Sequence, residues 1–572
     1  MTLRAAAAIA TMLLTLCISG ARAADAVPST TTPIEHVIVI VGENVSFDNV
    51  FATYEPPPGQ SVSNLLSRGI VDRDGNPGPR FALAIQREAS VRDRYTVTPA
   101  VTDAYKTLPQ PGTNSARGLP GYALDTRFPV DLPNGPFRIT RYVAYDAPLG
   151  DPVHRFFQMW QQLDGGKMDL FTWVAVTSGE GSRQRDDPGS STNQGALAMG
   201  FYSMAGGDAP YFRELARSYA IADNYHQPVM GGTGANYLAL STGHAGVYLE
   251  SGKPAVPPPN QIEDPDPREG TNNWYKQSGY RAGSYVACAD ASQPGVKAIR
   301  DYLASLPYKA FNGGNCAPGS YYLVNNYSPG YSFDGTPQPL GASKYVLPPQ
   351  TMPEIGSALA AKRMSWKWYS GGRTATGIDK DLYCSICDPL THSTAIMTGP
   401  LRANLQGLDA LYRDLASEKT LPAVSFVVPP NPESGHPATS TVFELERFVK
   451  GIVEKVKASP AWSKSAILIT TDEGGGYYDS GYVQSIDFFG DGTRIPFIAV
   501  SPFAKKGYVD HTYYDHVSVL KFIERNWKLP PLSNASRDNL PNPVMNAADP
   551  YVPANRPAIG DLMNLFDFGF RP

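Results

Sequence analysis

The strongest constraint on this chain is an uninterrupted apolar run near its start. Residues 36–41 read HVIVIV, with consecutive β-favouring aliphatic side chains and no alternation between apolar and polar residues. Such a strand is typically buried on both faces, as in a parallel sheet. Ligands bind beyond the carboxyl ends of strands in open α/β sheets, so the polar residues after this run are candidates for a site.

Further strand and helix patterns alternate along the chain. Helical periodicity, with apolar residues along one stripe, covers residues 443–458 and recurs at 515–527. Strand-like runs occupy residues 365–369, 423–428, 466–470 and 496–500. This alternation predicts an α/β fold with a mainly parallel sheet sandwiched between helices.

One long stretch departs from that alternation. Residues 251–345 are rich in Pro, Gly, Tyr and Asn and show little helical periodicity. We expect a loop-rich insertion or cap over the edge of the sheet. The aromatic side chains in this stretch either pack together or bind a cationic headgroup, and packing is the favoured interpretation.

The first residues have the pattern of a secretory signal peptide. Arg4 precedes an apolar stretch over residues 5–19, and Ala21-Arg22-Ala23 matches a cleavage site. We expect residues 1–23 to be removed, residues 24–572 to form the mature catalytic domain, and the product to be periplasmic or secreted. An uncleaved anchor is the alternative. No later stretch is long and apolar enough for a stable membrane anchor.

The bulk composition indicates a globular protein. The chain has 572 residues, 42% hydrophobic and 18% charged, with a formal net charge of -4. A mildly acidic chain without a long Lys/Arg run is not expected to bind nucleic acid. Its oligomeric state cannot be derived from these features.

Four cysteines remain after removal of the signal: Cys288, Cys316, Cys384 and Cys387. An even number in an exported protein predicts disulfides. Pairing by sequence proximity gives Cys288–Cys316 and Cys384–Cys387, and two other pairings are open. A zinc or redox role for the CSIC motif is a less favoured alternative, because no second Cys or His pair stands at finger-like spacing.

Two strands end in acidic residues. Glu43 and Asn44 follow the first run, and Asp472 and Glu473 follow residues 466–470. Adjacent carboxylates repel one another unless they are paired or bind a cation. Oxygen ligands suit Ca²⁺, Mg²⁺ or Mn²⁺, and Zn²⁺ if a histidine joins them. The alternatives are a helix cap near Asn44 and Ser46, and an acidic surface turn.

A hydroxyl group flanked by glycines is a candidate nucleophile. Thr233 lies in GGTGANYLALST, where the pattern predicts a helix starting near the Thr. A hydroxyl at a helix start has a field favourable to anions, and a metal can activate it for attack. Taken alone, such a Thr is usually an N-cap. Asn236 follows three residues later, on or near the same face.

Among the eight histidines, His154 and His436 stand in polar loop settings. Each alone is more often structural or solvated than catalytic.

Six motifs together resemble the bacterial phosphoesterase family of secreted acid phosphatases and type C phospholipases. They occur in the order ENVSFDNVF, GGKMD, DNYHQPVMGGTGAN, LPAVSFVVPP…GHP, ITTDEGGGYYD and RIPFIAVSPFAKKGYVDHTYYDHVSVLKFIERNW. The resemblance runs from about residue 33 to the C-terminus and implies an alkaline-phosphatase-like fold.

The resemblance also implies roles for residues. Glu43 and Asn44 match one metal-binding pair, and Asp472 and Glu473 match the second. The nucleophile position holds Thr233. The resemblance also implies that Asn236 contacts the substrate phosphoryl group and that His154 and His436 line the phosphoryl pocket.

Three positions depart from the family pattern. Val45 stands where Arg is usual after Glu-Asn, and Gly474 stands where relatives often carry His. Cys387 and Asp388 occupy the place of a His-His pair, with His392 nearby but out of register. These departures put leaving-group protonation and a second metal site in doubt.

The resulting prediction is a metal-dependent phosphomonoesterase, an acid phosphatase acting through a covalent phosphothreonine. The alternatives are a phospholipase C that cleaves phospholipid headgroups, and a secreted binding protein that keeps the fold without catalysis. The expected ligand is a small phosphate ester or a phospholipid headgroup.

Overall fold

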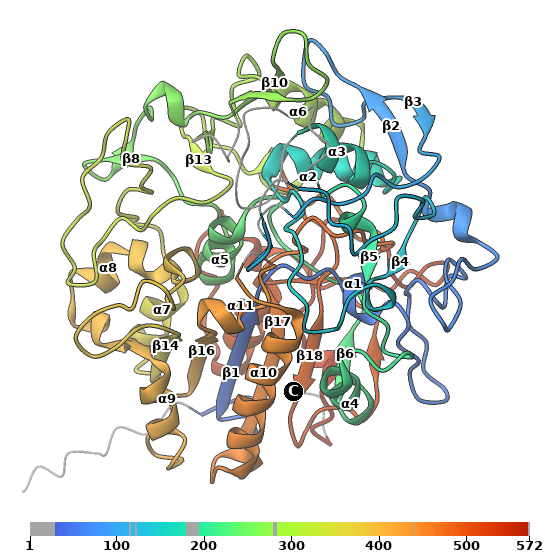
Figure 1. Cartoon of the computed structure of the whole chain (residues 1–572). Coiled ribbons are helices and arrows are strands. Elements are labelled where there is room, and N and C mark those ends of the chain that lie inside the picture. The colour runs from blue at the N-terminus through green and yellow to red at the C-terminus, as the bar shows by residue number, and fades with distance from the viewer. Residues whose placement is uncertain are drawn as a thin grey trace, which may run out of the picture.

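The computed structural model describes residues 29–113, 116–120, 123–178, 194–277, 283–437 and 439–569. The expected signal peptide, residues 1–23, lies outside these ranges. Eight strands form one central sheet (Figure 1). In spatial order they are β15 (Leu405–Gly407), β14 (Trp366–Ser370), β16 (Val424–Val428), β1 (His36–Gly42), β17 (Ser465–Thr471), β18 (Phe497–Val500), β6 (Ala220–Ala222) and β19 (Val509–Asp510).

The sheet is mainly parallel, as predicted. Neighbouring strands from β15 to β17 all run parallel, and so do β6 and β19. Strand β18 is the exception and runs antiparallel to both β17 and β6. The five strands predicted from sequence are all present, with ends within one residue of those expected.

Strand β1 is buried on both faces, which explains its uninterrupted apolar sequence. Ile38 and Ile40 belong to one hydrophobic core, whereas Val37, Val39 and Val41 belong to a second. The two cores therefore lie on opposite sides of the sheet, because successive strand residues point to opposite faces. This arrangement confirms the α/β sandwich.

Helices cover each face. Helix α10 (Val442–Ala458) contributes its apolar stripe to the first core, together with α4 (Pro210–Ser218). On the second face lie α7 (Ile355–Ala361) and α11 (Val517–Trp527), and α5 (Thr233–Thr242) contributes Tyr237 and Leu240. The helices predicted at 443–458 and 515–527 correspond to α10 and α11.

The remaining elements are short. Paired strands are β2 (Arg87–Ser90) with β3 (Ala100–Ala104), β4 (Phe137–Arg138) with β5 (Gly200–Phe201), and β7 (Tyr225–His226) with β20 (Tyr514–Asp515). The other helices are α1 (Phe47–Phe51), α2 (Phe156–Leu163), α3 (Phe171–Thr177), α8 (Thr394–Met397) and α9 (Leu408–Asp414).

The stretch 251–345 is loop-rich and lies at the top of the molecule in Figure 1. Its elements are β9 (Lys253–Pro254) paired with β8 (Leu249–Glu250), β10 (Asp264–Pro267) with β11 (Tyr275–Gln277), β12 (Tyr285–Val286) with β13 (Tyr322–Leu323), and helix α6 (Val296–Ser305). Its aromatic residues Trp274, Tyr275 and Tyr285 are buried, in agreement with packing; Tyr280 lies outside the described residues.

Both sequence-local disulfides are present. Cys288 is bonded to Cys316 within the loop-rich stretch, and Cys384 is bonded to Cys387 in the loop that follows β14. Of the three pairings open at the sequence level, this is the one that the structure contains. Within the described ranges, no helix combines the length and the hydropathy needed to traverse a bilayer.

Candidate active site

The register of two neighbouring strands brings the acidic pairs together. Gly42, the last residue of β1, lies opposite Thr471, the last residue of β17. The residues that follow therefore leave the sheet side by side. The Asn44 N–H donates to Asp472 Oδ1 over 3.1 Å, and the Val45 N–H donates to the Glu473 carbonyl over 3.0 Å.

The third contributor is the loop after β16, the strand on the other side of β1. Its Ser434 carbonyl accepts a hydrogen bond from the Glu43 N–H over 2.8 Å, and His436 follows two residues later. The cap interpretation of the first motif also holds in part. Ser46 is the N-cap of α1, because its side chain accepts a hydrogen bond from the Asn49 N–H.

Thr233 is the first residue of α5, and its glycine neighbours allow close approach of other segments. A Cβ atom at Gly231 would lie 1.8 Å from the Val324 carbonyl oxygen. At Gly232, a Cβ atom would lie 2.7 Å from Asn326 Oδ1 and 2.8 Å from Arg155 Nη1. The glycines are therefore required because the loop-rich stretch and a buried arginine press against the start of the helix.

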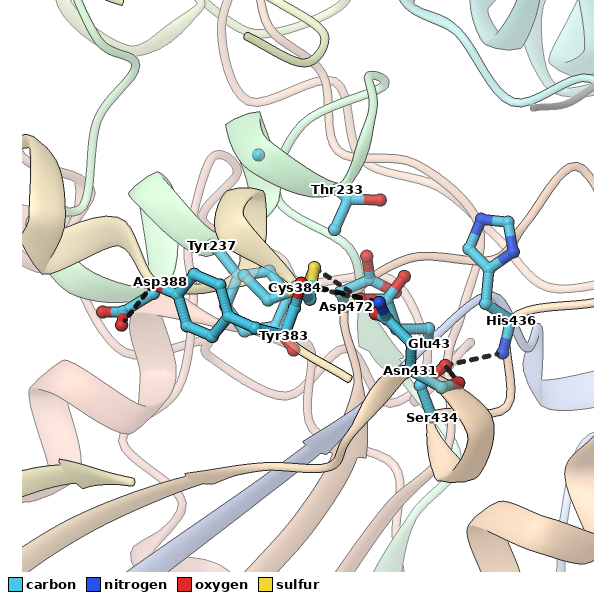
Figure 2. Close-up of a disulfide and its surroundings, with 12 residues drawn as sticks. Glu43, Thr233, Tyr237, Tyr383, Cys384, Asp388, Asn431, Ser434, His436 and Asp472 are labelled. Carbon is cyan, nitrogen blue, oxygen red and sulfur yellow. Dashed lines mark hydrogen bonds between the residues drawn. A yellow bond between two sulfur atoms is a disulfide. The ribbon is translucent and has the colours of Figure 1, made fainter. Parts of the chain in front are cut away.

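The Thr233 hydroxyl faces the second acidic pair. Its oxygen donates to Glu473 Oε1 over 3.4 Å, and hydrogen bonding from Thr233 also reaches Asp472. Figure 2 shows Thr233 above the Glu43 and Asp472 carboxylates, with His436 to one side. The structure thus brings the predicted nucleophile to the predicted metal-binding residues.

The acidic residues here are buried without sufficient compensation. Burial raises the pKa of Asp472 to about 7, despite hydrogen bonds from the Asn44 and Glu473 N–H groups and from Thr233. The pKa of Glu43 is raised by burial and by the charges of Asp472 and Asp151. Burial and the Asp472 charge likewise raise that of Glu473, although Arg155 opposes this.

Several oxygen atoms at this position are suited to a cation. Asp472 Oδ2, Glu473 Oε2 and Asn44 Oδ1 are buried and have no hydrogen-bond partner among the described residues. Buried polar atoms are normally satisfied, so such atoms at the meeting point of two strand ends fit ligands of a hard divalent cation. Glu43, Asp472 and Glu473 do not form a compact set within the described residues, so binding one ion by all three requires side-chain rotation.

Two compact sets of ligand-type side chains lie beside these oxygens. In the described residues, ligand atoms within 4.8 Å of one another occur in Glu43/Cys384/Cys387 and in Asp151/His154/His436. The second set contains both predicted histidines. His154 Nδ1 lies 3.5 Å from Asp151 Oδ1, and His436 Nε2 lies 4.0 Å from Asp151 Oδ2.

The hydrogen bonds of His154 define its tautomer. Its Nδ1 lies 2.6 Å from the Pro152 carbonyl oxygen, which can only accept, so Nδ1 carries the hydrogen. Burial lowers the pKa of His154 to about 4, and the ring is neutral above that pH. Its unprotonated Nε2 then faces Glu473 Oε1 at 4.0 Å.

Two residues of the site were not identified from the sequence. Asp151 is fully buried between the two histidines, and Arg155 places a nearly buried cation next to Gly232. The spacing Asp151-x-x-His154 was a usable signal, since an acid three residues before a histidine can orient its ring. Arg155 had no such signal, because its position beside Gly232 depends on how the start of α2 meets the start of α5, far along the chain.

Asn236 lies in the first turn of α5, and its side chain is hydrogen-bonded within the chain. Its Oδ1 accepts from the Val229 N–H over 3.0 Å, and its Nδ2 donates to the carbonyls of Gly231 and Gly232. Both donor hydrogens therefore hold the loop before Thr233. Its role as a substrate contact stays a prediction.

The residues that depart from the family pattern, Val45, Cys387 and Asp388, each have defined surroundings in the structure. Val45 lies in an apolar cavity with Leu445 and Ile469. Asp388 accepts from Arg373 over 2.7 Å and from the Tyr383 hydroxyl over 2.8 Å, so it is part of a buried ion pair. Cys387 is bonded to Cys384, and the disulfide contacts Glu43 (Figure 2).

Two large cavities of the described residues lie elsewhere. One measures about 730 Å³ and is lined by Cys288, Cys316, Arg300 and Phe488. The other measures about 740 Å³ and lies near the C-terminus, and neither is lined by a predicted site residue. The candidate site is instead compact: Thr233 is 2% exposed, and the side chain of His436 is 17% exposed.

Comparison with known proteins agrees with these observations. The model of the Phosphoesterase family matches residues 34–530. The chain therefore belongs to the phosphoesterase family.

Similar proteins carry two kinds of name. Hemolytic phospholipase C of Pseudomonas aeruginosa is 26% identical over 397 residues, which cover 65% of this chain and 43% of that protein. Phospholipase C A of Mycobacterium tuberculosis is 22% identical over 570 residues, covering 92% and 79%. A probable acid phosphatase of Kluyveromyces lactis is 24% identical over 290 residues, covering 48% and 58%.

Coverage of the relatives is partial. The chain spans between 38% and 59% of the length of the Pseudomonas and Burkholderia phospholipases C that it matches. Among solved structures, a protein in the alkaline phosphatase superfamily from Vibrio parahaemolyticus shares 10% identity, with 57% of this chain and 63% of that chain covered. The TM-score of 0.27 supports no conclusion about the site.

Proposed function

We propose that this protein is an exported, metal-dependent phosphomonoesterase with Thr233 as its nucleophile. One observation carries the proposal. The Thr233 hydroxyl lies at the first turn of α5 and within 3.4 Å of Glu473, beside buried acidic oxygens that have no partner among the described residues. A structural threonine cap does not require carboxylates in this position.

Glu43, Asn44, Asp472 and Glu473 are the residues proposed to hold a divalent cation. The Asn44 N–H donates to Asp472, and Glu473 accepts from Thr233. Such a cation lowers the pKa of a nearby hydroxyl and neutralises phosphoryl oxygens. Carboxylate and amide oxygens favour Ca²⁺, Mg²⁺ or Mn²⁺, and participation of His154 Nε2 would favour Zn²⁺.

The proposed chemistry has two displacement steps. Thr233 Oγ1 forms a bond to phosphorus, its proton passes to Glu473, and the bond from phosphorus to the leaving oxygen breaks. His436, the more exposed of the two histidines, supplies a proton to that oxygen and regains one from solvent. Water then attacks phosphorus and releases a proton to solvent. The bond from phosphorus to Thr233 Oγ1 breaks, Glu473 returns its proton to that oxygen, and phosphate leaves.

Other residues stabilise the transferred group. The N-terminus of α5 directs the positive end of the helix dipole towards an anion, although its Gly234 N–H already donates to Asn326 Oδ1. Arg155 places a positive charge beside Gly232. Asn236 contributes by holding the loop before Thr233, through the bonds described above. Together these groups act by positioning and charge stabilisation.

The test compares hydrolysis of an aryl phosphate by wild type, Thr233→Ala and Thr233→Ser. Thr233→Ala should lower the rate at least ~10³-fold, which corresponds to a barrier higher by about 4 kcal/mol. Thr233→Ser should keep much of the activity. Thr242→Ala is the matched control, because Thr242 lies at the other end of the same helix and donates to the Leu238 carbonyl. A Thr233→Ala variant that keeps a tenth of the activity refutes the nucleophile assignment.

The second candidate function is phospholipase C activity, favoured by the names of several relatives. It would use the same nucleophile and cation on a phosphodiester. The aromatic residues of 251–345 that could bind a cationic headgroup are buried where the structure describes them: Trp274 is 1% exposed and Tyr285 is 0% exposed. This favours the monoester, and turnover on phosphatidylcholine compared with the aryl phosphate decides between them.

A further inference from the structure

The disulfide Cys384–Cys387 lies against one of the proposed metal ligands. Cys387 Sγ is 2.6 Å and Cys384 Sγ is 3.7 Å from Glu43 Oε1 (Figure 2). A disulfide sulfur carries no hydrogen, so these contacts are not hydrogen bonds in the oxidised protein. The contact places two sulfur atoms and a carboxylate oxygen within 4.8 Å of one another.

We propose that reduction of this disulfide creates a second metal site, in which Cys384, Cys387 and Glu43 bind a zinc-class divalent cation. The spacing Cys-x₂-Cys is typical of zinc sites, and thiolates select Zn²⁺ over hard cations. Three protein ligands leave a fourth position for water. The site shares Glu43 with the proposed function but does not depend on it.

The geometry fits a tetrahedral ion. Zn–S bonds of about 2.3 Å and Zn–O bonds of about 2.0 Å place ligand sulfur and oxygen atoms roughly 3.5 Å apart. The distance from Cys384 Sγ to Glu43 Oε1 is already 3.7 Å. Opening the sulfur–sulfur bond allows Cys387 Sγ to move away from the carboxylate towards the same separation.

The surrounding loop would hold the two cysteines in place after reduction. The adjacent Asp388 accepts hydrogen bonds from Arg373 and Tyr383, and the Arg373–Asp388 ion pair is buried. The disulfide closes a loop with a sequence separation of 3, so its loss relaxes the unfolded chain little. The ligands therefore remain preorganised without the covalent bond.

The reduction step is open to an external reagent. Cys384 is partly exposed, whereas Cys387 is fully buried. A trialkylphosphine attacks one sulfur, and water completes the reaction: the phosphine is oxidised to its oxide, and the two sulfurs gain two electrons and two protons. Binding of Zn²⁺ to the dithiol then releases those two protons.

The second disulfide of the protein provides a matched comparison. Cys288–Cys316 has a sequence separation of 28 and lies in the loop-rich stretch. Among the described residues, neither Cys288 nor Cys316 belongs to a compact set of ligand-type side chains. Reduction should therefore create a metal site at one disulfide and none at the other.

The experiment uses the full chain, reduced with the phosphine and desalted without oxygen, and titrated with Co²⁺ as a spectroscopic substitute for zinc. Reduced wild type and reduced Cys288→Ser/Cys316→Ser should bind one Co²⁺ with thiolate-to-cobalt charge-transfer absorption that Zn²⁺ abolishes. Cys384→Ser/Cys387→Ser and unreduced protein should show none. Glu43→Gln should weaken cobalt binding at least tenfold while absorption at saturation persists.

Two results overturn the proposal: charge-transfer absorption that persists in Cys384→Ser/Cys387→Ser, or its absence in reduced wild type. If the double variant does not fold, alkylation of reduced wild type mapped to Cys384 and Cys387 replaces it, and must remove the absorption. Failure here is separable from failure of the proposed function, because Thr233→Ala is assayed on oxidised protein.

Discussion

The loops after β1 and β17 contribute two clusters of buried acidic residues. The clusters differ in whether a basic side chain pairs with their negative charge. Glu43 and Asp48 follow β1, while Asp472 and Asp479 follow β17. The later acids, Asp48 and Asp479, share Arg494, which makes five hydrogen bonds and is 1% exposed. The earlier acids have no comparable cation in direct contact among the described residues.

The net pKa shifts of Asp479 and Asp472 are opposite in direction. Burial raises the pKa of Asp479, but Arg494 outweighs it, so the net shift is downward. At Asp472, burial outweighs the hydrogen bonds it accepts, and the pKa is raised to about 7. Arg494 pairs with the Asp48–Asp479 cluster, although burial still raises the pKa of Asp48 to about 6. Because no such cation contacts Glu43 or Asp472 among the described residues, we place the proposed metal at that cluster.

The largest effect is expected at the Asp48–Asp479 cluster. Arg494→Met leaves Asp48 and Asp479 buried without their cation, and should lower the free energy of unfolding by about 3–5 kcal/mol. Urea denaturation of the variant and wild type measures this. Adding Asp479→Asn should recover part of the loss. A stable Arg494→Met protein would show that the two clusters are electrostatically equivalent.

Metal removal should act on the other cluster. A cation present at 100 times its dissociation constant stabilises the folded state by about 2.7 kcal/mol, so chelation should lower both melting temperature and activity. Calorimetry with and without chelator, followed by readdition of Mg²⁺, Ca²⁺, Mn²⁺ or Zn²⁺, measures the effect and identifies the ion. An unchanged melting temperature would contradict a resident cation.

A smaller effect is expected from Glu43→Gln. This change removes one repelling charge near Asp472, so the metal-free variant should unfold no more readily than metal-free wild type. Relief of repulsion equal to one pKa unit corresponds to a gain of about 1.4 kcal/mol. Metal affinity should fall at the same time. Normal metal content and activity would instead mean that Glu43 only begins the loop before α1.

The smallest effect is expected at an exposed ion pair. Arg73 Nε lies 2.7 Å from Glu55 Oε1, with the two side chains 68% and 47% exposed. Arg73→Ala should change the free energy of unfolding by no more than about 0.5 kcal/mol, because water and salt screen the pair. A loss near that of Arg494→Met would show that pairing, rather than burial, separates the clusters.

The sequence alone determined the main strands of the sheet, two of its helices and the acidic residues that follow two strands. Continuous apolar runs such as 36–41 are required of strands buried on both faces, and amphipathic periodicity determined α10 and α11. Because the carboxyl ends of parallel strands lie at one edge of a sheet, the sequence also predicted that the acids after β1 and β17 share that edge. That the two strands are neighbours came from the strand order of the folded sheet. The periodicity of each strand or helix is local, so a single stretch of residues contains the information for it.

Tertiary structure alone decided which charges meet. Nothing in the local sequence distinguishes Arg494 from Arg155. In the folded protein, Arg494 forms ion pairs with Asp48 and Asp479. Arg155 lies beside Gly232 instead. The same is true of Cys384 and Cys387, whose contact with Glu43 bridges more than 340 positions. Such contacts depend on the packing of distant loops, which no local periodicity or spacing encodes.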